Sequence, residues 1–192
     1  ALKPDVLLLI EVDGPEAAVA VQSERLTQLC REMGAHEVNV ARTVAENDEI
    51  WKARRSVYGA GARLKPTAIA EDCTVPLANL VAMFQEVARI AEKYQLPIPI
   101  VAHAGDGNLH PMILTDGSDP EEMRRVVQAM DEISIRAVDL GGTLTGEHGI
   151  GIAKREMMPF EIGEAAMEIT RNIKKVFDPL NIVNPDKVVR IV

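Results

Sequence analysis

The chain has 192 residues, of which 47% are hydrophobic and only 3% aromatic, and its formal net charge is −8. This length suits one domain with an aliphatic core, and the acidic balance argues against nonspecific nucleic-acid binding, which needs a basic surface. No apolar stretch approaches the roughly 18 residues of a membrane span, and no segment resembles a signal peptide.

The two cysteines, Cys30 and Cys73, are too few for a disulfide framework and lack the spacing of metal ligands. We therefore expect buried thiols in a reducing compartment, which favours a cytoplasmic location. The sequence begins at Ala1, without a methionine, and soon becomes strand-like, so we expect a piece of a longer protein.

In the first half of the chain, strand-like and helical patterns alternate. Short apolar runs predict strands, the first of them buried, and apolar side chains at helical spacing predict helices. The expected strands are 6–12, 37–41 and 68–75, and the expected helices are 16–33, ended by Gly34, and 47–58.

In the second half, Pro76 opens a helix with a regular 3.6-residue apolar period, and a hairpin follows within residues 101–114. Asp119 is expected to cap the next helix, with Pro120 at its first position and Glu122 completing a capping box. After a glycine-rich loop, a final helix is expected at 163–177.

The hairpin requires antiparallel pairing, and there are too few parallel-crossover patterns for a doubly wound fold. We therefore predict an α+β fold with a mainly antiparallel sheet and helices packed on it, forming one domain over residues 1–192.

The hairpin stretch reads VAHAGDGNLHPMIL, and it contains two histidines. A two-residue type I′ turn at Asp106-Gly107 would place His103 directly opposite His110, on one face of the sheet. Their Cβ atoms would then lie roughly 4.5–5.5 Å apart, so the two imidazoles could bind one metal ion. The alternative is two unrelated histidines, one buried and one exposed.

A glycine-rich loop at 141–151 contains the pair Glu147-His148. It lacks the Gly-Lys-Ser/Thr of a phosphate-binding loop, and its spacing and the preceding helix do not fit a dinucleotide fingerprint. Glu147 could be a third, oxygen ligand, leaving His148 beside the metal and free to move a proton. The alternative is that both are exposed loop residues. We expect the remaining histidine, His36, at the surface.

Several segments together resemble the C-terminal domain of FAD-linked oxidases, in the vanillyl-alcohol oxidase superfamily, which includes the flavin subunit of glycolate oxidase and D-lactate dehydrogenase. The segments that carry the resemblance, in chain order, are WKAR at 51–54, Asp72 with Thr74-Val75-Pro76, HAGDGNLHP at 103–111, GEHGIG at 146–151, and FDPLN at 177–181 with NPDK at 184–187. The resemblance covers nearly the whole chain.

This resemblance implies a ferredoxin-like cap domain whose N-terminal FAD-binding domain is absent from the sequence. It further implies that FAD is the redox cofactor and that a divalent metal, Zn, Fe or Mn, is bound. The roles it implies are metal binding by His103, His110 and Glu147, catalysis by His148 as base, substrate binding by Arg54 and Asn108, and cofactor binding by Asn184.

The implied partners are a small 2-hydroxy acid, the protein's own FAD domain and other oxidase subunits, through which it could sit peripherally at a membrane. The related D-2-hydroxyglutarate dehydrogenases carry an asparagine where this chain has Met112 and a lysine where it has Ala70. A monocarboxylic substrate such as glycolate or D-lactate therefore fits better. The competing hypotheses are a non-catalytic ligand-sensing or assembly module and a stand-alone metallohydrolase.

Overall fold

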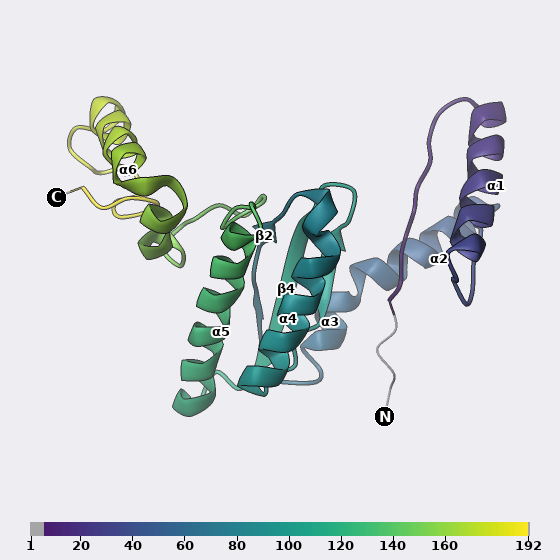
Figure 1. Ribbon diagram of the computed structural model, residues 1–192, viewed down its shortest axis with the longest axis horizontal. Helices are drawn as coiled ribbons and strands as arrows, with labels where there is room; N and C mark the ends of the chain where they lie inside the picture. The colour runs from purple at the N-terminus through teal and green to yellow at the C-terminus, as the bar shows by residue number, and fades with distance from the viewer. Residues whose placement is uncertain (1–5, 192) are drawn as a thin grey trace. The chain divides into compact units, whose positions relative to one another are not determined.

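The computed structural model describes residues 6–191, which form two compact units, one ending at Ser56 and the other beginning at Val57 (Figure 1). The first unit contains α1 (Glu16–Glu32) and α2 (Val44–Arg55). The second contains α3 (Val57–Gly61), β1 (Thr67–Ala70), β2 (Cys73–Thr74), the 3₁₀ turn η1 (Leu77–Asn79), α4 (Leu80–Tyr94), β3 (Ile100–His103), β4 (Asn108–Thr115), α5 (Pro120–Asp139), the 3₁₀ turn η2 (Arg155–Met157) and α6 (Met158–Phe177).

In the first unit, helix α1 confirms the prediction for residues 16–33, and Gly34 follows it with a φ of +88°. Helix α2 begins earlier than predicted, because Thr43 and Glu46 form a reciprocal capping box that the sequence reading missed. The chain turns at Ser56, so the predicted helix 47–58 is divided between α2 and α3.

The two strands predicted in this unit were wrong. Residues 6–12 and 37–41 have no regular secondary structure, and the side chain of Val6 is 91% exposed. An apolar run becomes a strand only where a neighbouring strand supplies partners for its backbone N–H and C=O groups. Within residues 6–56, no such ladder forms.

In the second unit, β4 is the strand with which all the others pair. Strands β1, β2 and β3 each pair with it in antiparallel orientation. The α+β prediction with a mainly antiparallel sheet is therefore confirmed. The strand predicted at 68–75 is interrupted at Glu71 and Asp72, where the chain passes from β1 to β2.

All eight residues of β4 are buried, because both of its faces are covered. Leu109 and Ile113 point to the side of helices α4 and α5, which lie side by side in Figure 1, and belong to the hydrophobic core. Successive side chains of a strand point to opposite faces, so Asn108, His110 and Met112 share the other face. The helices contribute to the core Met83, Val87, Ile90, Val126, Ala129, Ile133 and Ala137.

The hairpin between β3 and β4 forms as predicted, but its register was wrong. His103 pairs with Asn108, and His110 pairs with Val101. Four residues form the turn, and only Gly107 among them has a positive φ, whereas a type I′ turn needs two. A shift by two residues keeps side chains on the same face, so the histidines become diagonal neighbours, with ring centroids 5.3 Å apart.

Two helix ends differ in detail from the predictions. Asp119 caps α5 as predicted, but the Glu122 carboxylate accepts from Lys65 and from the backbone N–H of Asp116 and does not complete a capping box. Helix α6 begins at Met158, earlier than predicted, and Gly163 bends it with a φ of +74°. None of the helices within residues 6–191 is long and apolar enough to cross a membrane.

An ion-pair cluster joins α4 to α5. The Glu132 carboxylate accepts from Lys93 (2.5 Å), Arg89 (2.7 Å) and the hydroxyl of Tyr94 (2.9 Å). The hydrogen bonds from Lys93 and Arg89 outweigh the opposing effect of partial burial and lower the pKa of Glu132 to about 2, from an ordinary value of 4.5. The ionised carboxylate therefore stabilises the helix pair.

We expect Glu132→Gln to lower the free energy of unfolding by about 1 kcal/mol at pH 7, since both cations are half exposed and screened by water. A depressed pKa contributes stability above the unfolded value, and this contribution is lost as the pH falls from about 4.5 towards 2. Urea unfolding at pH 7 and at lower pH would test this. A difference between the two proteins that persists at acidic pH would contradict it.

Candidate metal centre

Three predicted metal ligands meet on the face of β4 that points away from α4 and α5. Glu147 Oε1 lies 2.9 Å from His110 Nε2 and 3.5 Å from His103 Nε2. The three candidate ligand atoms all lie within 4.8 Å of one another. Two imidazoles and one carboxylate suit Zn²⁺, Fe²⁺ or Mn²⁺ and leave coordination positions open for a substrate, so these residues fit a divalent metal.

The three side chains differ in their exposure. That of His110 is 4% exposed, whereas those of His103 and Glu147 are about half exposed. Burial lowers the pKa of His110, an effect that the charge of nearby Asp72 opposes. One buried and two accessible ligands place the candidate site at the protein surface.

His148 lies beside this group. Its ring stacks on that of His110, with centroids 4.8 Å apart and an angle of 14° between the planes. Its Nε2 atom is 3.9 Å from Glu147 Oε1, and its side chain is 47% exposed. The ring is therefore next to the three candidate ligands and is half exposed to solvent.

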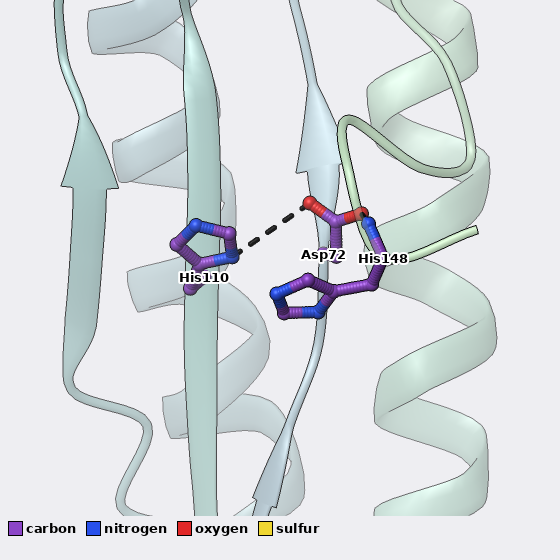
Figure 2. Close-up of side chains that lie close together, drawn as sticks. All are labelled: Asp72, His110 and His148. Atoms are coloured by element: carbon purple, nitrogen blue, oxygen red, sulfur yellow. Dashed lines mark hydrogen bonds and ion pairs between the residues drawn. The ribbon is translucent and has the colours of Figure 1, made fainter. Parts of the chain in front are cut away.

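Asp72 holds the glycine-rich loop, although the sequence predicted no role for this residue. Its Oδ2 atom accepts from the hydroxyl of Thr145 and from the backbone N–H groups of Gly146, Glu147 and His148, at 2.5 to 3.0 Å. Asp72, His110 and His148 lie close together in Figure 2, where one oxygen of Asp72 points towards the His110 ring. Only its presence in a resembling segment marked Asp72 in the sequence.

Asp72 is ionised at neutral pH even though it is buried. Burial opposes ionisation of the carboxyl group, but the bonds from Thr145 and from three backbone N–H groups outweigh it. Together they lower the pKa of Asp72 to about 2. A carboxylate that accepts several backbone hydrogen bonds behaves in this way.

Lys154 gives the loop a second anchor and was also missed in the sequence. Its ammonium group pairs with Glu71 Oε2 at 2.7 Å and donates to the carbonyl oxygens of Leu144 (2.7 Å) and Asp72. Both charged side chains of the pair are at least nine-tenths buried. This ion pair connects the segment before α6 to the chain between β1 and β2.

An open pocket of about 420 Å³ adjoins the candidate ligands. Its lining residues are Thr74, His103, Asp106, Asn108, Gly146 and Glu147. Among the residues that the structure describes, Thr74 Oγ1 and Asn108 Oδ1 are buried and have no hydrogen-bond partner. Asn108, expected to bind substrate, therefore lies at the pocket with unused hydrogen-bonding capacity.

The other candidate residues belong to other segments of the chain. Arg54 is half-buried in α2 of the first unit, whereas Arg55 and His36 are exposed, as expected for surface residues. Asn184, the candidate cofactor ligand, is exposed in the segment after α6, with a φ of +45°. Cys73 is a free thiol whose pKa burial raises to about 12, and Cys30 is free and half-buried.

Comparison with known proteins identifies relatives over most of the chain. Residues 2–188 match the family model for the C-terminal domain of FAD-linked oxidases. Glycolate oxidase subunit GlcD of Bacillus subtilis (strain 168) is 43% identical over 94% of this chain, and GlcD of Escherichia coli (strain K12) is 34% identical over 95%. The mitochondrial D-lactate dehydrogenase (cytochrome) of Arabidopsis thaliana is 31% identical over 95%.

This chain spans 38%, 37% and 32% of the lengths of these three relatives, respectively. Among solved structures, a 4-ethylphenol oxidase from Gulosibacter chungangensis, in complex with isoeugenol, matches with a TM-score of 0.56. The match covers 88% of this chain and 37% of the oxidase at 15% sequence identity, so it supports the fold alone. The family model and the sequence relatives together show that this chain belongs to the FAD-linked oxidase C-terminal domain family.

Proposed function

We propose that this chain is the substrate- and metal-binding part of a flavin-dependent 2-hydroxy-acid dehydrogenase or oxidase of the glycolate or D-lactate type. The reaction would oxidise the 2-hydroxyl group to a 2-oxo acid. The observation that carries the proposal is the meeting of His103, His110 and Glu147 beside an open pocket that two of them, His103 and Glu147, line. The names of the relatives, glycolate oxidase subunit and D-lactate dehydrogenase, give the substrate class.

In this proposal, His103, His110 and Glu147 would hold a divalent metal, which when bound lowers the pKa of the substrate hydroxyl and orients the acid. His148 would accept the hydroxyl proton, because an imidazole is the side chain that most often serves as a general base. FAD, held mainly by a domain outside this chain, would supply the redox chemistry as the hydride acceptor.

Two further residues are proposed to bind the substrate. Arg54 suits the carboxylate, because its planar guanidinium can donate to both oxygens. Asn108 can bind a polar group of the substrate from the pocket wall. Asn184 is proposed to contact the flavin, and other oxidase subunits are proposed partners, consistent with the word subunit in the names of two relatives.

The sheet face beside His110 favours a substrate with one carboxylate. Met112 follows His110 by two residues on the same face of β4, and Ala70 is its direct partner on β1. Neither side chain carries a charge or a hydrogen-bond donor, so this pair cannot bind a second carboxylate. We therefore propose glycolate or D-lactate in preference to a 2-hydroxy dicarboxylic acid.

The proposal is tested by measuring bound metal by elemental analysis after incubation with Zn²⁺ or Mn²⁺ and gel filtration. We expect about one metal ion per chain in the wild type and less than about a tenth of this in His103→Ala, His110→Ala and Glu147→Ala, because two ligands hold a metal weakly. His36→Ala, which alters an exposed histidine of the other unit, is the matched control and should keep the metal.

Calorimetric titration of the metal-loaded chain should then detect D-lactate or glycolate but not propionate, which lacks the 2-hydroxyl group. Metal bound equally by the wild type and the three ligand variants would overturn the site. Binding of D-lactate that survives loss of all three ligands would favour a non-catalytic binding module. Hydrolysis of an ester or phosphoester that depends on His148 would favour a metallohydrolase.

A further inference from the structure

The two oxygen atoms of Asp72 have very different surroundings. Oδ2 accepts four hydrogen bonds, all from residues 145–148. Among the described residues, Oδ1 is buried and has no hydrogen-bond partner. A buried carboxylate oxygen without a partner costs free energy, so the function of Oδ1 needs an explanation.

Oδ1 faces a second buried atom without a partner, Nδ1 of His110. The two atoms are 3.7 Å apart, longer than a hydrogen bond, and Nδ1 has no other partner among residues 6–191. A movement of less than about 1 Å would bring them to the ordinary N–H···O distance of about 2.9 Å. Figure 2 shows the carboxylate turned towards this edge of the ring.

The other ring nitrogen of His110 faces a candidate metal ligand, since Nε2 is 2.9 Å from Glu147 Oε1. A histidine that binds a metal through one nitrogen usually donates the N–H of the other to a carboxylate or carbonyl group, which fixes the tautomer and the orientation of the ring. The position of Asp72 relative to His110 matches this arrangement.

The other oxygen of Asp72 acts on the loop. Three consecutive backbone N–H groups and one hydroxyl converge on Oδ2, as they do in the backbone nests that bind anions. Glu147 and His148 supply two of these N–H groups, so the bonds fix the backbone from which both side chains extend. The carboxylate thus contacts the segments that carry one histidine ligand, the glutamate ligand and the candidate base.

From these contacts we propose that Asp72 is the positioning residue of the metal centre. Its Oδ1 accepts the Nδ1–H proton of His110, so that Nε2 is free to bind the metal, and its Oδ2 holds the loop that presents Glu147 and His148. This inference rests on the proposed metal-binding function, but the contact itself can be tested without metal.

The first test compares Zn²⁺ affinity, measured by competition with a chromogenic chelator, in the wild type and Asp72→Asn. We expect the variant to bind about 10- to 100-fold more weakly, the usual cost of losing such a partner. Asp178→Asn is the matched control. It also removes a buried carboxylate that accepts backbone N–H bonds, but its partners are Lys174 and the N–H groups of residues 182 and 183 rather than His110 and the glycine-rich loop. We expect its affinity within about threefold of the wild type.

Equal weakening by both substitutions would show a general loss of stability or charge and would overturn the positioning role. Wild-type affinity in Asp72→Asn would overturn it as well. Amide hydrogen exchange gives a second readout, because the N–H groups of residues 146–148 should exchange faster in Asp72→Asn and remain protected in Asp178→Asn.

The second test needs no metal. In metal-free Glu147→Ala, the competing acceptor at Nε2 is removed, and ¹⁵N NMR at about pH 8 should find His110 protonated on Nδ1. Adding Asp72→Asn should move the proton to Nε2. A proton on Nε2 already in Glu147→Ala would overturn the contact. If the wild type binds no Zn²⁺ but Nδ1 of His110 is protonated in Glu147→Ala, the metal-binding function fails and the contact with Asp72 stands.

Discussion

Substituting Lys154→Met should lower the free energy of unfolding by about 3–5 kcal/mol, the largest stability loss expected from any single change discussed for this chain. The variant would leave the Glu71 carboxylate buried with no opposite charge. It would also remove the donor to the carbonyl oxygens of Leu144 and Asp72. Urea unfolding followed by circular dichroism would measure the loss.

The double variant Glu71→Leu, Lys154→Met is the control for this result. A buried ion pair replaced by apolar side chains often costs little, so the double variant should be more stable than Lys154→Met by about 1–3 kcal/mol. The recovery should be partial, because the two carbonyl oxygens still lack their donor. Simple additivity of the two single substitutions would contradict a direct interaction between the charges.

Gly146→Ala should disrupt the candidate site from within the loop. A Cβ atom at this position would lie 2.5 Å from Asn108 Oδ1 and in severe overlap with Thr74 Oγ1, both of which face the pocket. The loop would have to move away from β2 and β4, carrying Glu147 away from the histidines. We expect a loss of about 1–3 kcal/mol in stability and at least about a tenfold loss in Zn²⁺ affinity, measured by chelator competition.

Gly105→Ala is the matched control, a glycine in the hairpin turn. No described atom beyond its neighbours lies within 4 Å of a Cβ at this position, and its φ is not in the left-handed region. We expect a change in stability below about 0.5 kcal/mol and wild-type affinity for Zn²⁺. Wild-type metal binding by Gly146→Ala would show that the loop tolerates the displacement and that its position is not critical.

The grouping of the candidate ligands could be predicted from the sequence although the hairpin register was wrong. The actual register differs by two residues from the predicted one, and a strand repeats its facing every two residues. His103 and His110 therefore share a face in both registers. An error of one residue would have separated them.

Other features depended on contacts that one sequence does not reveal. The apolar run at residues 6–12 reads as a strand, but strand formation needs a pairing partner, and pairing is a property of the folded chain. Asp72 and Lys154 lie far in sequence from several of the groups they bind, and neither has a local pattern that separates it from an ordinary surface charge. The antiparallel sheet was predictable because its central hairpin is local.

The sequence distances within the centre also bear on how the chain folds. The histidines belong to one hairpin, so local folding brings them together early, whereas the bond from Gly146 to Asp72 closes a loop of 74 residues. The two halves of the centre are thus joined only when this distant contact forms. A bound metal would therefore act as a cross-link between an early-forming and a late-forming part of the chain.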